Sequence, residues 1–367
     1  MIYFDSAATT LQKPPQVSEA VLYAMKHYSS VGRGGHSAAM GAAELVHACR
    51  VEAGALFHAE PEQVVFTMNA THGLNIAIRS LCEPSMTVVI SGFEHNAVLR
   101  PLRAMGARIV VAGRALFSPE SVIEGFRKAI DEGAKLAVCT CCSNVFGYVL
   151  PYRQIGNLCK EMGVPLILDA SQGAGVLPVF LKDTEAAFIA MPGHKGLYGP
   201  QGTGILLCTQ GGKPLLYGGT GSNSLDPGMP EELPDRQEAG THNVCGIAGL
   251  LAGLRYIRRR DPDRILAREQ RLMTRLIKGL EGDPGVILYR GKDQTGVLSM
   301  SFPDRDCQEV AGILARHGIG VRAGLHCAPL AHESAKTLPS GTLRLSLSDF
   351  NTREEVQRFL ALWKKLL

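Results

Sequence analysis

A lysine and a histidine stand together in a glycine-rich stretch, Gly193-His194-Lys195-Gly196. An apolar run, 186–191, precedes the stretch and a second run, 205–208, follows it, which is typical of a buried strand that ends at a tight turn. A lysine in such a place loses hydration, its pKa falls, and its amine can form a Schiff base. A surface lysine in a glycine loop is the alternative interpretation.

A carboxylate favours the chemical interpretation of this lysine. Asp169 follows the apolar run 165–168, which predicts another strand ending beside the one that leads to Lys195. An amine and an acid on neighbouring strand ends are what pyridoxal phosphate requires, because the lysine holds its aldehyde and the aspartate keeps its pyridine nitrogen protonated. The pair therefore predicts a site for pyridoxal phosphate.

The elements that would position these residues alternate along the chain. Strands are predicted over 64–67, 87–91, 108–112, 136–142 and 165–168, and helices over 17–28, 38–56, 74–81, 121–132 and 152–162. This alternation favours a mainly parallel sheet with helices on both faces, and ligands of such sheets bind beyond the carboxyl ends of the strands. The polar residues that fall just past predicted strand ends are Thr71, His95, Asn144, Asp169 and Lys195.

The C-terminal part of the chain predicts a smaller α+β unit. Its expected helices are 245–260, 264–280, 307–317 and 354–366, and its expected strands are 286–289, 296–301, 319–322 and 342–348. Because 367 residues exceed the usual single core, we expect two domains. The large domain would span 14–254, and the small domain would combine 1–13 with 255–367.

Two residues of the smaller unit could also do chemistry. Cys327 lies in a predicted loop beside His326 and near Arg322, and positive neighbours lower the pKa of a thiol. A buried structural cysteine is the alternative. Arg344 stands inside an apolar strand, where either a substrate carboxylate held by two hydrogen bonds or an internal salt bridge would be its partner.

Composition excludes several classes of protein. A net charge of +4 does not favour nucleic acid or an acidic membrane surface as a partner. No signal peptide is visible, and no apolar run approaches the roughly 20 residues that cross a bilayer. We therefore expect a cytoplasmic protein whose cysteines are thiols. Cys139 and Cys142 have CxxC spacing, but a structural zinc site needs four ligands, so we expect no metal.

Nine segments carry a resemblance to a known family. They are residues 5–10, 70–72, 94–95, 143–147, 169–172, 193–195, 238–241, 322–328 and Arg344. Through them the chain resembles the cysteine desulfurases, which are class V aminotransferase-fold enzymes, over nearly its full length. The resemblance implies an α/β fold of the aspartate aminotransferase-like, PLP-dependent transferase type and a homodimer. It also implies conversion of L-cysteine to L-alanine, with the sulfur passed to an acceptor protein.

The same resemblance implies roles for individual residues. Lys195 would be the Schiff-base lysine, Asp169 would pair with the pyridine nitrogen, and His95 would stack on the ring as a further catalytic residue. The ring's phenolic oxygen and the substrate would be contacted by Asn144 and Gln172. The phosphate would be held by Thr71, His72 and His194, with Thr241 reaching in from the other subunit. The substrate carboxylate would be bound by Arg344 and Arg322, and the sulfur would be accepted by Cys327 as a persulfide.

Three positions depart from the family pattern. Pro192 stands where many relatives have Ser or Thr, and Leu325 replaces the first of two histidines that often precede the cysteine. Gly32 replaces the first histidine of a His-Arg-Gly-x-His pattern, which leaves Arg33 and His36. Two alternatives to desulfuration stay open. One is another reaction with the same cofactor, such as selenocysteine lyase, cystine lyase or another β-elimination or transamination, and the other is a non-catalytic sulfur-transfer scaffold.

Overall fold

A seven-stranded sheet forms the centre of the larger part of the molecule. The computed structural model describes residues 1–32, 34–222 and 225–366, so Arg33 lies outside the described residues. The strands are β2 (Val64–Thr67), β3 (Thr87–Ser91), β4 (Arg108–Ala112), β5 (Leu136–Thr140), β6 (Leu166–Asp169), β7 (Phe188–Pro192) and β8 (Gly204–Cys208). They are ordered β2-β8-β7-β6-β5-β3-β4, and only β8 runs antiparallel to its neighbours, which confirms the mainly parallel sheet among the described residues.

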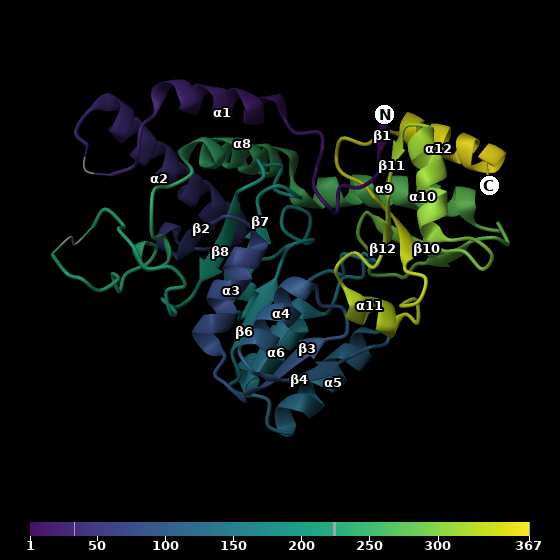
Figure 1. The fold of residues 1–367 in the computed structure, drawn as a ribbon, viewed down its shortest axis with the longest axis horizontal. Helices are drawn as coiled ribbons and strands as arrows, with labels where there is room; N and C mark the ends of the chain where they lie inside the picture. Colours follow the sequence, from purple (N-terminus) through teal and green to yellow (C-terminus); the bar gives the residue numbers. More distant parts are fainter. Residues whose placement is uncertain (33, 223–224, 367) are drawn as a thin grey trace.

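Helices cover both faces of this sheet (Figure 1). They are α1 (Pro15–His27), α2 (Ser37–Phe57), α3 (Ala70–Leu81), α4 (Asn96–Ala104), α5 (Pro119–Asp131), α6 (Tyr152–Glu161), α7 (Leu181–Thr184) and α8 (Val244–Arg260). Alternate residues of β3 enter different cores, since Val88 and Ile90 belong to one buried cluster and Val89 to another. A strand that is buried on both faces reads as a continuous apolar run, which is why the sequence predicts β3 to the residue.

A second, antiparallel sheet lies toward the C-terminus. Its strands are ordered β12 (Arg322–Gly324), β13 (Thr342–Ser346), β10 (Val297–Ser301) and β9 (Ile287–Tyr289). Its helices are α9 (Pro262–Leu280), α10 (Cys307–Arg316), α11 (Pro329–Ser334) and α12 (Arg353–Leu366). The N-terminal strand β1 (Ile2–Tyr3) pairs with β11 (Ile319–Gly320) and joins this core, so the two chain ends lie close together (Figure 1). The predicted division at 254/255 falls inside α8, and the domain limits stay a prediction.

One predicted strand differs from the structure, and helix α4 of the large part has no predicted counterpart. The single strand expected over 319–322 is wrong, because β11 pairs with β1 whereas β12 pairs with β13 in another sheet. Helix α4 was not predicted, because Pro101 inside it removes a backbone N–H donor and reads as a helix breaker. In the described part of the chain, every helix is too short or too polar to span a bilayer.

Candidate active site

The predicted lysine and aspartate lie at the same end of the large sheet. Asp169 is the last residue of β6, and Lys195 follows the end of β7, which pairs with β6 in parallel through Asp169 and Ala190. Both side chains line one cavity. The same cavity is lined by five more of the predicted residues, Thr71, His95, Asn144, Gln172 and His194. The structure therefore brings together seven of the residues that the sequence selects.

Burial changes the chemistry of Lys195. Removal of its amine from solvent lowers its pKa to about 8, and the positive charges of Arg344 and Arg322 act in the same direction. The carboxylate of Asp169 opposes the shift and keeps it from being larger. A substantial share of the amine is therefore neutral near pH 8, which is the form that attacks a carbonyl group.

Asp169 is held in one orientation by the residue two positions further on. Its Oδ1 accepts hydrogen bonds from the backbone N–H of Ser171 at 2.9 Å and from the Ser171 hydroxyl at 2.5 Å. Asp169 is buried. Since both of these bonds go to Oδ1, Oδ2 is available to a cationic N–H donor in the cavity. Ser171 lies in the motif 169–172 without a predicted role, although a serine two residues after an aspartate often closes such a turn.

Two histidines form part of the cavity wall. His95 caps α4, where its Nδ1 accepts from the Ala97 N–H at 3.0 Å, and burial lowers the pKa of this histidine. The Nδ1 of His194 lies 3.0 Å from the Thr9 hydroxyl. Burial and the nearby charge of Lys195 lower the pKa of His194 to about 4. Both rings are therefore neutral near pH 7 and can stack or hydrogen-bond without adding charge.

The N-terminus of α3 faces the cavity through Thr71. Asn69 caps this 12-residue helix by accepting from the His72 N–H at 2.9 Å. The first amides of a helix and its dipole favour an anion, and phosphate is the usual one. Pro192, which also lines the cavity, contributes no hydroxyl there. An anion in this part of the cavity would therefore depend on the helix end and on the side chains of Thr71 and His194.

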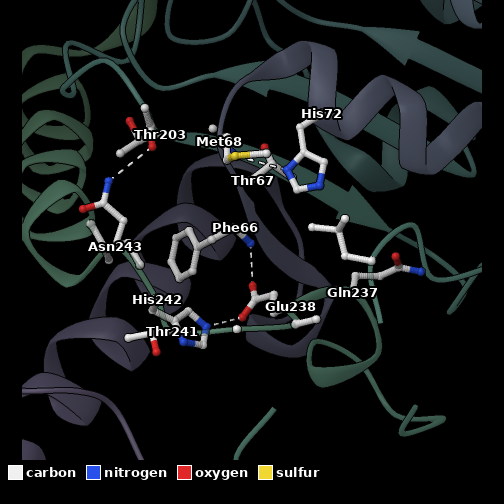
Figure 2. Close-up of a pocket in the computed structure, with 16 residues that line it drawn as sticks. Phe66, Thr67, Met68, His72, Thr203, Gln237, Glu238, Thr241, His242 and Asn243 are labelled. Atoms are coloured by element: carbon white, nitrogen blue, oxygen red, sulfur yellow. Dashed lines mark hydrogen bonds and ion pairs between the residues drawn. The ribbon is translucent and has the colours of Figure 1, made fainter. Parts of the chain in front are cut away.

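His72 and Thr241 lie apart from the other predicted residues. They line a separate cavity of about 220 Å³ between the N-terminal end of α3 and the segment 237–243 (Figure 2). The Nε2 atom of His72 is buried and has no partner among the described residues. Thr241 is exposed. In the single chain, these two residues do not share the cavity of Lys195.

A buried ion pair fixes the segment that carries Thr241. Glu238 accepts hydrogen bonds from the Phe66 N–H at 2.5 Å, from His242 Nε2 at 2.6 Å and from Arg50 Nη1 at 2.9 Å (Figure 2 draws the first two). These contacts lower the pKa of Glu238 against the effect of its burial. The segment is thereby attached to β2 and α2.

The two predicted substrate arginines share one carboxylate. Arg344 is buried, and its Nη2 lies 2.8 Å from Asp5 Oδ1, while Arg322 Nε lies 3.1 Å from Asp5 Oδ2. The internal salt bridge considered for Arg344 is therefore present. Its Nη1 donates to the backbone oxygen of Asn144 at 2.8 Å, and its Nε is buried without a partner among the described residues. The sequence predicts no role for Asp5, because 339 positions separate it from Arg344 and hide the pairing.

Cys327 differs from the other cysteines by its exposure. All ten cysteines lie in described residues, and only Cys327 is classed as exposed. It lies outside the cavity of Lys195, but the turn that carries it is tied to that cavity, because Asn144 Nδ2 donates to the oxygen of His326 at 2.8 Å. In contrast, Cys139 and Cys142 are buried in the core, and burial raises the pKa of both thiols.

Comparison with known proteins gives one consistent result. The sequence profile of aminotransferase class-V matches residues 2–359. A probable cysteine desulfurase of Pyrococcus abyssi is 32% identical, and the match covers 100% of this chain and 94% of the relative. A cysteine desulfurase of Escherichia coli O157:H7 is also 32% identical, with 98% and 92% covered.

Solved structures agree with the sequence matches. The apo structure of the cysteine desulfurase from Thermococcus onnurineus NA1 superposes with a TM-score of 0.91 at 33% identity, covering 100% of this chain and 94% of that chain. An Escherichia coli cysteine desulfurase in its S-sulfonic acid form gives a TM-score of 0.87 at 26% identity, with 99% and 94% covered. The fold class predicted from the sequence is thereby confirmed.

Proposed function

This chain belongs to the aminotransferase class-V family, and we propose that within it the protein is a pyridoxal-phosphate-dependent cysteine desulfurase. It would convert L-cysteine to L-alanine and leave a persulfide on Cys327 for transfer to an acceptor protein. The names of the relatives support this function. The observation that carries it is the cavity shared by Lys195 and Asp169, whose lining residue Asn144 donates a hydrogen bond to His326, the neighbour of the exposed Cys327.

The residues of the cavity fit the cofactor. Lys195 offers a partly neutral amine to the aldehyde, Asp169 offers Oδ2 to the pyridine nitrogen, and His95 offers a neutral ring to the ring face. When bound, the cofactor supplies an electron-withdrawing ring next to the substrate. The phosphate would be held by Thr71, His194 and the first turn of α3, and the phenolic oxygen by Gln172 and Asn144.

The remaining steps belong to side chains of this chain. Arg344 would bind the substrate carboxylate, for which Asp5 must share or release the guanidinium. Lys195 would move a proton at the substrate Cα as a general base. The Cys327 thiolate would attack the sulfur of cysteine, so that a sulfur–sulfur bond forms and the carbon–sulfur bond breaks. The electron pair of that bond and a proton go to the alanine product.

A homodimer would give His72 and Thr241 their expected roles. Thr241 is exposed on a fixed segment, and His72 has a buried nitrogen without a partner among the described residues. Both features suit a phosphate site that a second copy completes. Exposed apolar side chains on α1, including Leu22 and Met25, offer a surface for such a contact.

Product analysis tests the proposed function. Purified protein loaded with pyridoxal phosphate is incubated with L-cysteine and a thiol reductant, and alanine and sulfide are measured for the wild type and for Cys327→Ala. We expect equal amounts of the two products from the wild type and loss of both from the variant. Full activity of the variant would exclude the persulfide route. Parallel assays with selenocysteine and cysteine sulfinate would reveal a lyase if either substrate is turned over faster than cysteine.

A further inference from the structure

The turn that carries Cys327 has an unusual backbone. His326 and Cys327 are consecutive residues with left-handed φ values of 50° and 55°, a conformation that side chains other than glycine disfavour. Such a turn persists only when its surroundings hold it. Two contacts hold its carbonyl groups, since the His326 oxygen accepts from Asn144 Nδ2 and the Cys327 oxygen accepts from the Asn96 N–H, each at 2.8 Å.

A second set of contacts involves the side chain of His326. The ring of His326 is buried and lies nearly parallel to the ring of His332, which is 0% exposed, with the two planes 13° apart and the ring centres 5.7 Å apart. His326 Nδ1 lies 3.5 Å from His332 Nε2, and His332 Nδ1 lies 2.7 Å from the Thr337 hydroxyl. At the other end, His326 Nε2 lies 3.3 Å from the backbone oxygen of Arg322.

The chemistry of the groups determines which atom donates and which accepts at each contact in this chain. A carbonyl oxygen only accepts, so His326 must donate from Nε2, and its Nδ1 is then free to accept from His332 Nε2. His332 Nδ1 in turn accepts from the Thr337 hydroxyl. Burial lowers the pKa of His326 to about 3 and that of His332 to about 4, so both rings are neutral near pH 7 and the order holds.

We propose that His332 is a positioning residue for Cys327. Its contact with the ring of His326 holds that ring in place and thereby holds the left-handed turn that presents the thiol. This inference rests on the proposed role of Cys327 as the sulfur acceptor. It also gives a structural meaning to the departure at Leu325. The side chain of Leu325 is 40% exposed, and the second imidazole next to His326 comes from α11 instead.

Three variants separate this role from general packing. His332→Phe keeps an aromatic ring beside His326 but removes both nitrogen atoms. Thr337→Val removes only the hydroxyl that orders His332, and it provides the test should the first variant not fold. Ser334→Ala is the matched control, because it removes a hydroxyl of the same short helix that donates to the Gly92 oxygen at 2.9 Å.

Hydrogen–deuterium exchange of the full-length protein measures how firmly the turn is held, and it does not require an active enzyme. The informative amides are Asn96 N–H, which donates to the Cys327 oxygen, and Ala328 N–H, which donates to the Leu325 oxygen at 2.9 Å. We expect exchange in these peptides to accelerate about tenfold in His332→Phe, less in Thr337→Val, and not in Ser334→Ala. Unchanged exchange in His332→Phe, or equal acceleration in the control, would overturn the proposal.

Kinetics of the loaded enzyme give a second readout. His332→Phe should lower kcat for alanine formation about tenfold with little change in KM, because the turn presents the thiol and the cysteine carboxylate binds elsewhere. His332→Gln, which can still donate an amide N–H toward His326 Nδ1, should recover part of the loss. A rise in KM alone, or no recovery, would contradict a positioning role. Should the protein not desulfurate cysteine at all, the exchange result still decides the position of the turn.

Discussion

The cavity of Lys195 and the turn of Cys327 solve opposite problems. Lys195 needs removal from water, since burial lowers the pKa of its amine to about 8, and the ends of two buried strands supply that environment. In the proposed function Cys327 needs access to solvent, since its persulfide must reach an acceptor, and an exposed turn supplies that access. The deep site is built from regular strand ends, whereas the exposed site is built from a left-handed turn held by the Asn144 side chain and the Asn96 backbone N–H. The reactivity of Lys195 therefore comes from its buried environment, whereas that of Cys327 would come from the position of its thiol on the turn.

The largest expected effects are those of replacing Lys195 or Cys327, and only the first replacement should change the absorbance of the bound cofactor. Lys195→Ala should remove the visible absorbance of the lysine-linked cofactor and lower the rate of alanine formation by about 10⁴-fold, because the general base is lost. Cys327→Ala should abolish product formation but leave the absorbance of the protein unchanged, because the exposed turn does not line the cavity. Absorbance spectra and alanine assays of the two variants test the separation. If Cys327→Ala loses the visible band as well, the two regions are one structural unit.

The pH dependence of Lys195 reports on the deep region alone. With its pKa lowered to about 8, half of the amine is neutral at that pH, about 100-fold more than in an ordinary lysine. Because the neutral amine is the reactive form, its labelling should rise with pH and level off above pH 8. Cofactor-free protein is treated with pyridoxal phosphate and reduced with borohydride, and the labelled Lys195 peptide is quantified. Nα-acetyl-lysine, which has a free and hydrated side-chain amine, is the control. Labelling that parallels the control into the alkaline range would mean that the amine stays hydrated.

The deep region could be predicted from the sequence, and much of the exposed one could not. The ends of strands can be recognised from the local sequence, because each is an apolar run that stops at polar residues. Parallel pairing of β6 and β7 then brings Asp169 and Lys195 together. The contacts around Cys327 depend on tertiary structure. His332 lies in a six-residue helix that the sequence does not reveal, and Asp5 meets Arg344 from the other end of the chain. Only the folded chain shows these pairs.

Asp5 bridges two strands of the smaller sheet, because it pairs with Arg322 of β12 and with the buried Arg344 of β13. Asp5→Asn leaves a buried guanidinium without its charge partner, so we expect the free energy of unfolding to fall by about 3 kcal/mol. The control is Glu281→Gln, which breaks an ion pair with Arg290 whose side chains are 51% and 52% exposed. That change should cost about 0.5 kcal/mol or less. Urea unfolding of both variants measures the difference, and equal losses would show that burial gives the Asp5 pair no special weight.

The smallest effect concerns the orientation of Asp169 within the cavity. Ser171→Ala removes one of two hydrogen bonds to Asp169 Oδ1 and leaves the bond from the Ser171 backbone N–H in place. Loss of one such bond should cost about 1 kcal/mol, which is a fivefold weaker retention of the cofactor during dialysis. Ser334→Ala again serves as the control, since its hydroxyl donates to Gly92 and not to Asp169. A loss as large as that in Asp169→Asn would mean that the serine hydroxyl, and not the backbone amide, sets the direction of the carboxylate. The deep region would then depend on side-chain contacts as much as the exposed turn does.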